Sequence, residues 1–184
     1  MKRRGISVLG PSNVKDGDWI AKQAFCLGEL IAKAGYVCVN GGYGGVMEYV
    51  SRGAISAGGK VIGVTVKGIE TKNPYLTEKK EMEFFPRLQY LLERPKIFFS
   101  PEGSKGTLLE FAAALVRNDA PTVMLIEGNT HWKLFDPLPQ LWGDQNLMNI
   151  SDVTNSAKEA VDSIEVAFFR EQEKDEWLRE SSRG

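Results

Sequence analysis

The chain has 184 residues, of which 42% are apolar and 26% are charged. This length and composition predict one soluble globular domain over residues 1–184, and they exclude collagen-like and wholly disordered proteins. Lys and Arg number 23 against 24 for Asp and Glu, which gives a net charge of −1. The balance argues against a nucleic-acid-binding protein but leaves room for a small anionic ligand, which needs only a local cluster of donors.

The cysteines, the histidine and the apolar runs further restrict the kind of protein that this chain can be. Cys26 lies in an apolar helical pattern and Cys38 in a strand-like run, so both are interpreted as small buried hydrophobic residues. The single histidine, His131, does not suggest a zinc site, and no metal ligands are assigned. The apolar run after the basic residues 1–4 is too short for a signal peptide, and no stretch approaches the length of a membrane span. We therefore expect a cytoplasmic protein that does not act at a membrane.

The first half of the chain alternates short apolar runs with helical patterns. Residues 6–9 predict a buried strand that ends in turn-forming residues. Asp18 is placed to cap a helix whose apolar residues recur at helical spacing, and Gly35 is placed to end it. Next come, in order, a strand over 36–39, a glycine-rich turn over 40–45, a helix from 46 that ends at 58–59 and a strand over 61–66.

The second half predicts, in order, a polar loop over 67–77, a helix over 81–94, a strand over 97–99, a glycine-bearing turn over 100–107, a helix through 108–115 and a strand over 122–126. Pro86 either kinks the first of these helices or marks its true start. An irregular aromatic lobe over 131–142 and a long amphipathic helix over 156–179 follow, and residues 171–184 are expected to fray.

Strands that alternate with helices predict right-handed crossovers and a parallel sheet. The expected fold class is α/β, a three-layer Rossmann-like, doubly wound parallel sheet with helices on both faces. In this fold, residues 37–39 and 61–64 should be neighbouring parallel strands.

Two glycine-rich turns at strand ends mark a candidate ligand site. Open parallel sheets bind ligands beyond the carboxyl ends of their strands, where the strand order reverses. Glycine lets the backbone approach a phosphate, and the following helix offers N–H groups and a positive dipole end. Neither turn matches the P-loop or the dinucleotide pattern, and the alternative is that the glycines serve turn geometry alone. The residues expected to bind phosphate or nucleotide are Gly10, Ser12, Gly41, Gly42, Gly44, Gly45, Gly103, Ser104, Gly106 and Thr107.

Both turns carry a resemblance to a known family. Residues 40–48, NGGYGGVME, resemble the GGGxxGLMG turn of the LOG family, whose members include cytokinin-activating phosphoribohydrolases and proteins called lysine decarboxylases. Residues 101–110, PEGSKGTLLE, resemble its PGGxGTxxE signature. One more residue separates the glycines from Gly-Thr, as in the branch that contains molybdenum-cofactor carrier proteins and uncharacterised bacterial proteins. The resemblance covers about residues 5–170 and implies the same Rossmann-like architecture.

The resemblance implies that Arg87 and Glu110 form a catalytic pair. Glu110 stands three residues after Thr107, where the family glutamate stands, and Arg87 occupies the place of the family arginine. Cleavage of an N-glycosidic bond builds oxocarbenium character at the sugar carbon, which a carboxylate can stabilise. An arginine can bind a phosphate or the neighbouring acid. The alternatives are that Glu110 only complements its helix dipole and that Arg87 is a surface or interface residue.

Three departures from the enzymes keep two functions open. Asn40 and Glu102 stand where the enzymes have glycine, and Leu88 follows Arg87 where they usually have lysine. A carboxylate beside a phosphate repels it unless the side chain points away. The expected function is therefore that of a nucleoside 5′-monophosphate phosphoribohydrolase or of a molybdenum-cofactor carrier without hydrolase activity. Either would hold a small phosphorylated ligand, a nucleotide or the molybdenum cofactor, and require no other cofactor. A third hypothesis is an inert or nucleotide-sensing domain.

The resemblance also implies self-association, as a homodimer or a dimer of dimers, because LOG-like proteins are usually dimers. Two apolar helix faces could supply the surface: Leu88, Leu91, Leu92, Leu108, Phe111, Ala112 and Leu115. The alternative is that these residues only cover the sheet.

Overall fold

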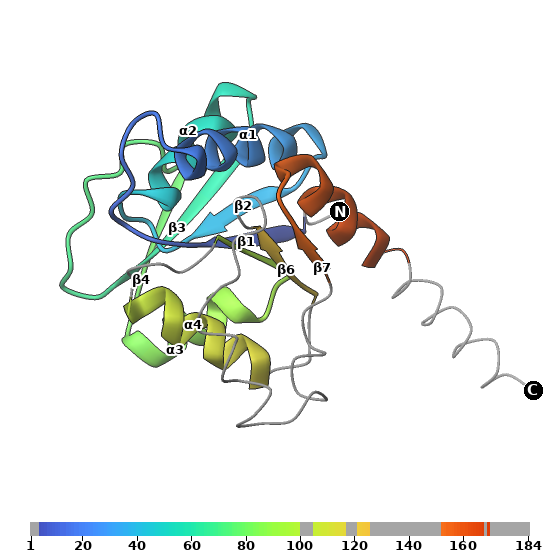
Figure 1. Cartoon of the computed structure of the whole chain (residues 1–184). Helices are drawn as coiled ribbons and strands as arrows, with labels where there is room; N and C mark the ends of the chain where they lie inside the picture. The colour runs from blue at the N-terminus through green and yellow to red at the C-terminus, as the bar shows by residue number, and fades with distance from the viewer. Residues whose placement is uncertain (1–3, 100–104, 117–120, 126–151, 168, 170–184) are drawn as a thin grey trace, which may run out of the picture.

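Seven parallel strands form one open sheet in the order β4-β3-β2-β1-β5-β6-β7 (Figure 1). The structure is a computed structural model in which residues 4–99, 105–116, 121–125, 152–167 and 169 are described. The strands are β1 (Gly5–Leu9), β2 (Val37–Asn40), β3 (Lys60–Val66), β4 (Glu78–Met82), β5 (Lys96–Phe99), β6 (Thr122–Leu125) and β7 (Asp152–Thr154). Every neighbouring pair is parallel, and β2 pairs with β3 through Cys38 and Val61, as the sequence predicts.

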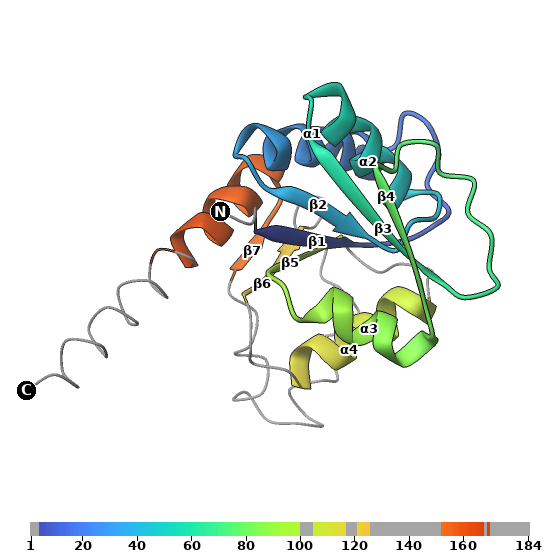
Figure 2. The ribbon, with the colours of Figure 1, turned by 180° about the vertical axis from the view of Figure 1, so that it is seen from behind.

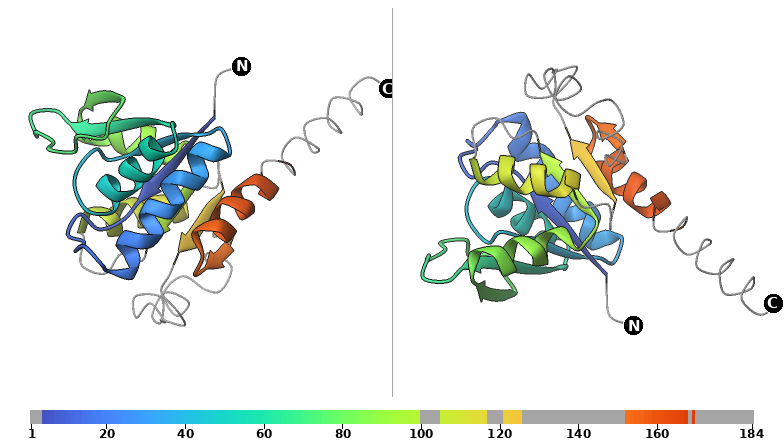
Figure 3. Two further views of the ribbon diagram at one scale, coloured as in Figure 1. Left: turned by 90° about the horizontal axis from the view of Figure 1, so that it is seen from above. Right: turned by 90° about the horizontal axis from the view of Figure 1, so that it is seen from below.

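Helices cover both faces of this sheet, so the sheet and its two helical layers give three layers (Figures 1 and 2). The labelled helices are α1 (Trp19–Lys33), α2 (Val46–Ser56), α3 (Phe84–Leu92) and α4 (Lys105–Val116), and residues 157–167 are also helical. Figure 3 shows α1 and α2 side by side on one face, with α3 and α4 on the other. The sheet therefore buries one apolar cluster against each helical layer. This confirms the three-layer, doubly wound α/β fold class.

The strand order reverses beside β1. From β1 the chain winds outward through β2, β3 and β4 on one side, and β5, β6 and β7 lie on the other. The crossovers on the two sides leave β1 and β5 in opposite directions, which opens a crevice at their carboxyl ends. The fold alone therefore points to this edge of the sheet as the place for a ligand.

Glycines determine how α1 and α2 end and how closely they pack. Gly35 has φ of 82°, its N–H donates to Ala32 O, and the N–H of Tyr36 donates to Ile31 O, both at 3.0 Å. This pairing of the last carbonyls confirms the predicted end of α1. Between the helices, a Cβ on Gly53 would lie 1.9 Å from Phe25 O, so this contact admits only glycine. Asp18 stands at the N-cap of α1, as predicted, but its carboxylate accepts from Lys15 N at 3.0 Å and makes no hydrogen bond to a helical N–H.

The region before α3 differs from the prediction. Residues 78–82 form the edge strand β4 and the helix begins only at Phe84, so a helix over 81–94 is wrong at its start. Pro86 lies in the first turn of α3, so it marks the start of the helix, which was the second of the two predicted alternatives. The EKKEM sequence of β4 resembles that of a solvated helix in composition, yet charged side chains are also a common protection of an exposed sheet edge. Along this strand, Lys79 pairs with Glu81 and Lys80 with Glu78, both at 2.6 Å.

Several expectations concern other parts of the chain. The aromatic lobe over 131–142, the turn residues 100–104 and the tail over 171–184 lie outside the described residues. The strand β7 has no counterpart in the prediction. In the described part of the chain, no helix is both long and apolar enough to cross a bilayer.

Candidate functional site

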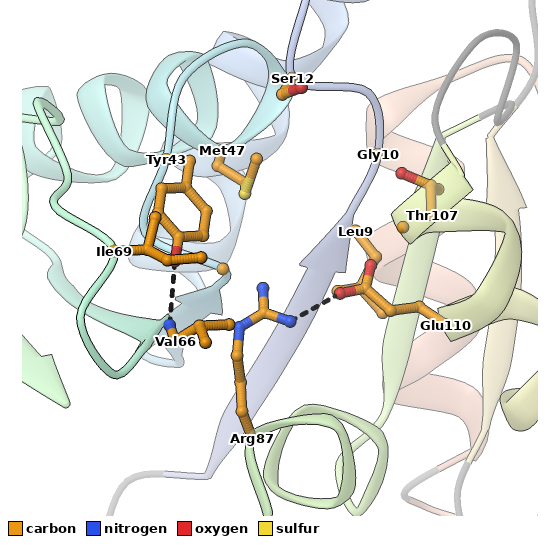
Figure 4. Close-up of a pocket in the computed structure, with 12 residues that line it drawn as sticks. Leu9, Gly10, Ser12, Tyr43, Met47, Val66, Ile69, Arg87, Thr107 and Glu110 are labelled. Atoms are coloured by element: carbon orange, nitrogen blue, oxygen red, sulfur yellow. Dashed lines mark hydrogen bonds and ion pairs between the residues drawn. The ribbon is translucent and has the colours of Figure 1, made fainter. Parts of the chain in front are cut away.

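A cavity of about 370 Å³ opens beyond the carboxyl ends of β1, β2 and β3 (Figure 4). It lies where the strand order reverses, and α3 and α4 provide its remaining wall. The lining residues are Leu9, Gly10, Ser12, Gly41, Tyr43, Met47, Val66, Ile69, Arg87, Gly106, Thr107 and Glu110. Seven of the sequence-predicted site residues are among them: Gly10, Ser12, Gly41, Arg87, Gly106, Thr107 and Glu110.

The segment after β1 and the start of α4 form one side of this cavity. Gly106 and Thr107 lie in the first turn of α4, where the positive end of the helix dipole favours an anion. Gly10 directly follows β1, and a Cβ there would lie 2.9 Å from a methyl of Val46 and 3.0 Å from Phe99 Cβ. The glycine at this position thus lets β1 pack closely against its neighbours while Ser12 reaches the mouth of the cavity.

Arg87 and Glu110 meet on the floor of the cavity as a buried ion pair. Arg87 comes from α3 and Glu110 from α4, and their Nη1 and Oε1 atoms are 3.1 Å apart. The side chains are 9% and 12% exposed. Arg87 Nε also donates to the carbonyl of Val64 in β3, at 2.7 Å. The guanidinium is therefore held by the sheet as well as by the carboxylate.

Each member of the pair keeps capacity for a ligand. Among the described residues, Arg87 Nη2 and Glu110 Oε2 have no hydrogen-bond partner. Nη2 lies beside Gly41, where an added Cβ would be only 2.4 Å away. A side chain at position 41 would thus displace the guanidinium, so the glycine is needed for the arginine as much as for the turn.

Burial raises the pKa of the Glu110 carboxyl, and the charge and hydrogen bond of Arg87 oppose that rise. The carboxylate is thus strained by desolvation and supported by one cation. Perturbed carboxyl groups in cavities are frequent at functional sites. In this position Glu110 can orient a water molecule or a hydroxyl, or stabilise positive charge on a ligand.

The first glycine-rich turn builds the cavity more than it lines it. Gly42, Gly44 and Gly45 are not lining residues. Gly42 and Gly45 have φ of 79° and 63°, and a Cβ on Gly45 would lie 2.4 Å from Pro11 O. Gly45 thus lets the turn pack against the segment after β1, and Gly42 lets it pack against Gly63 and Thr65 of β3, so the two glycines shape the cavity without facing it. Gly103 and Ser104 of the second turn, with Glu102, lie outside the described residues.

A buried amide network, which motif reasoning missed, holds the first turn in place. Asn40 Oδ1 accepts from Gly42 N at 2.8 Å, and its Nδ2 donates to Ser51 Oγ at 2.9 Å. Asn73 Nδ2 donates to Tyr43 O at 3.1 Å and to Ser51 Oγ at 3.3 Å. Asn40 therefore has a structural reason to stand where the family has glycine. The sequence signal that could have revealed this network was an asparagine at the end of a buried strand, where its side chain can bond to the backbone of the following turn.

The apolar part of the lining was also missed. Leu9, Met47 and Val66 belong to core-like patterns, and Ile69 belongs to a stretch predicted only as a loop. Only Tyr43, an aromatic residue inside a glycine-rich turn, gave a local signal. No group of His, Cys, Asp and Glu that could hold a metal ion is found within the described ranges.

Comparison with known proteins gives matches in sequence and in fold. A sequence model of the SLOG cluster4 family matches residues 3–154. An uncharacterised protein of Archaeoglobus fulgidus is 32% identical over 116 residues, which is 62% of this chain and 76% of that protein. The solved molybdenum cofactor binding protein of Rippkaea orientalis has a TM-score of 0.72 and 25% identity, covering 90% of this chain and 98% of that one. The molybdenum cofactor carrier protein of Chlamydomonas reinhardtii, at 23% identity and a TM-score of 0.71, covers 91% and 99% and shares the fold.

Proposed function

Since the chain belongs to the SLOG cluster4 family, we propose that it binds a small phosphorylated ligand in the cavity beside β1. The observation that carries this proposal is the Arg87–Glu110 pair, which is buried, faces the cavity and leaves one nitrogen and one oxygen available there. The first turn of α4 adds a second source of positive potential at the same place. An anionic group bound between the Arg87 guanidinium and the first turn of α4 would meet positive potential on both sides.

The first candidate ligand is the molybdenum cofactor, which the protein would hold as a carrier. The solved relatives from Rippkaea orientalis and Chlamydomonas reinhardtii are described as binding or carrying that cofactor. Their architecture extends over nearly all of this chain. In a carrier, the residues of the cavity would bind and orient the ligand, and Glu110 would position it without breaking a bond.

The second candidate is phosphoribohydrolase activity on a nucleoside 5′-monophosphate. The available Oε2 of Glu110 favours it, because a carboxylate held by an arginine on one side can stabilise a sugar cation on the other. Arg87 would then bind phosphate or fix the carboxylate. Both candidates use the same cavity, so the assay for released base decides between them.

Binding is tested by changing the first turn of α4. Gly106→Val places a branched side chain at the wall of the cavity, and we expect it to abolish the binding of AMP in calorimetry while the far-ultraviolet circular dichroism stays unchanged. Ile55→Val in α2 is the control, because Ile55 is 37% exposed and does not line the cavity. A folded Gly106→Val variant with unchanged affinity would place the ligand elsewhere.

We further propose that the protein self-associates through its α3–α4 layer. The predicted face is only partly available, because Leu91, Leu92, Phe111 and Leu115 are buried against the sheet. However, α4 is apolar on its outer side as well, which is unusual for a helix that faces water. The exposed apolar residues of this layer are Phe84, Phe85, Leu108, Leu109 and Val116.

A further inference from the structure

The connection between β3 and β4, over residues 67–77, is a loop without a helix. Parallel strands are usually joined through a helix, whose own hydrogen bonds keep the crossover in shape. Here side-chain hydrogen bonds take over that task. Because they reach the first glycine-rich turn, they bear on the ligand site as well as on the path of the loop.

Asn73 is the centre of these hydrogen bonds. It is 8% exposed, its Nδ2 donates to Tyr43 O at 3.1 Å, and its Oδ1 accepts from Tyr75 N at 3.0 Å. The Thr71 hydroxyl accepts from Asn73 N at 3.1 Å and donates to Gly42 O. Two successive carbonyl groups of the turn are therefore bonded to side chains of the loop.

These two bonds fix the orientation of two peptide units in the turn. The described chain has no cis peptide bond, and in a trans peptide the N–H points away from the C=O. The N–H groups of Tyr43 and Gly44 therefore point away from the loop. Within the described residues, neither of them donates a hydrogen bond. Any tilt of these peptide units would redirect both donors.

Tyr43 and Arg87 depend on the same turn. The Tyr43 hydroxyl oxygen accepts from Val66 N at 2.9 Å (Figure 4), and the guanidinium carbon of Arg87 lies 6.0 Å from the centre of the Tyr43 ring. Gly41, two residues earlier, leaves the space that Arg87 Nη2 occupies. Asn73 itself does not line the cavity, so it can affect a ligand only through these residues.

We propose that Asn73 is a positioning residue for the ligand: its amide holds the Tyr43 carbonyl and so sets the first glycine-rich turn against Arg87, with Thr71 in support. The assignment rests on the proposed function, the binding of a small phosphorylated ligand in this cavity. It places a determinant of affinity in the β3–β4 loop, outside both glycine-rich turns. A turn that is oriented in advance saves the entropy that ordering it on binding would cost.

Neutral substitutions in the loop test this role. Calorimetry of the wild type with AMP, a pterin monophosphate and inorganic phosphate first identifies the tightest probe. Asn73→Ala removes the donor to Tyr43 O, and Thr71→Val removes the donor to Gly42 O. Each should weaken the binding of that probe by about tenfold. Urea unfolding of each variant checks that it is folded under the conditions of the assay.

Thr77→Val is the matched control, because Thr77 belongs to the same loop but does not bond to the turn. Its hydroxyl donates to Val61 O at 2.7 Å and accepts from Val61 N at 2.9 Å, at the start of β3. The control thus loses two hydrogen bonds of the loop, and it should bind the probe as the wild type does.

Asn73→Asp provides a rescue that a purely structural role would not produce. The new carboxyl can accept from Tyr75 N at any pH, but it can donate to Tyr43 O only when it is protonated. Relative to wild type, its affinity should therefore be nearly restored at about pH 4.5 and fall as the pH rises to about 8. Glu110 and the probe titrate in both proteins, so the ratio removes their effect. Asn73→Ala should show its deficit at every pH.

Hydrogen exchange reads the position of the turn without a ligand. In Asn73→Ala, exchange of the Val66 amide, which bonds to Tyr43, should accelerate more than that of the Val61 amide, which bonds to Thr77. In Thr77→Val the order should be reversed. The same acceleration of both amides in Asn73→Ala would show that the loop loosens as a whole, and would overturn the positioning role.

The binding data separate failure of this inference from failure of the proposed function. Wild-type affinity in folded Asn73→Ala and Thr71→Val would overturn the positioning role and leave ligand binding in the cavity intact. So would an equal loss of affinity in Thr77→Val. If Asn73→Ala does not fold, Thr71→Val and the pH series of Asn73→Asp decide the question. Failure of the wild type to bind any of the three probes would overturn the proposed function, and the role of Asn73 with it.

Discussion

At the scale of single residues, the site is centred on one carboxylate whose charge is supported by one guanidinium. Glu110 and Arg87 are joined at 3.1 Å, and both are buried. Removing one partner of such a pair leaves the other charged and desolvated, which costs more than the pair itself contributes. The stability and the activity of variants at these two positions must therefore be measured separately.

Glu110→Gln tests the catalytic role proposed for the carboxylate. If the protein hydrolyses nucleoside monophosphates, the variant should lose nearly all release of free base, because the amide cannot stabilise the sugar cation in the transition state. Nucleotide affinity should change little, since shape and hydrogen bonding are kept. The assay uses AMP, GMP, CMP, UMP and isopentenyl-AMP. Wild-type inactivity on the whole panel would remove the catalytic role of Glu110 for these substrates.

The same substitution tests the effect of burial on Glu110. Burial raises the pKa of this carboxyl above its ordinary value of 4.5, so the folded protein binds the proton more tightly than the unfolded chain. The stability that this provides is fully present below about pH 4.5 and is lost as the pH rises through the raised pKa. The free energy of unfolding of Glu110→Gln, relative to wild type, should therefore increase with pH. Urea unfolding between about pH 4.5 and about pH 8 measures it, and a constant or decreasing difference would contradict the prediction.

At the scale of elements, the turn between β2 and α2 joins three parts of the site. Its first glycine gives room to Arg87, its tyrosine lines the cavity, and its last glycine packs on the segment that carries Ser12. Two asparagine side chains hold the turn: Asn40 accepts from Gly42 N, and Asn73 donates to Tyr43 O. A distortion anywhere in the turn should therefore reach the whole cavity.

Two glycines of this turn make a matched pair for testing that dependence. Gly45→Ala should destabilise the protein by about 2 kcal/mol or more, because φ is 63° and the new Cβ would lie 2.4 Å from Pro11 O. Gly44→Ala should change stability by no more than about 0.5 kcal/mol, since the nearest atoms, Ser12 O and Glu48 Oε2, would be 3.6 and 3.7 Å from the new Cβ. Chemical denaturation measures both variants. Equal losses would show that close packing of this turn is not what requires glycine.

At the scale of the whole molecule, the two helical layers differ in how they meet water. The α1–α2 layer packs closely through Gly28 and Gly53, where a Cβ would lie 2.1 Å from Val50 O and 1.9 Å from Phe25 O. The α3–α4 layer instead leaves large apolar side chains exposed, including Phe85 at 76% and Val116 at 86%. This difference is the physical basis for placing an intersubunit contact on the second layer.

Sedimentation at micromolar concentration tests that contact. We expect a species of about twice the chain mass of 20.4 kDa, and Phe85→Lys should shift it toward the single chain by adding a charge to the apolar surface. Val166→Lys is the control, because Val166 is also exposed but lies in the helical stretch over 157–167, on the other face of the sheet. A wild-type species of 20.4 kDa alone would rule out the dimer.

The sequence by itself determined the features that depend on neighbouring residues. Apolar runs bounded by turn residues located the inner strands, and Gly35 located the end of α1, because strand burial and helix termination are local events. The same reasoning misplaced the start of α3, since the charged sequence of β4 is compatible with a solvated helix until β3 is present to pair with it. Arg87 and Glu110 were reached through the family motif.

Only the tertiary structure decided which residues share the cavity. Arg87 donates to a carbonyl 23 residues earlier in the chain and to a carboxylate 23 residues later, and Asn73 reaches back 30 residues to Tyr43. No local pattern encodes such contacts, because they arise when the parallel crossovers bring separate strand ends to one edge. For the same reason the glycines of one turn divide into Gly41, which lines the cavity, and Gly45, which packs behind it on Pro11. Ile69, on a loop without periodicity, became a wall of the site only through the bonds of Thr71 and Asn73 to that turn.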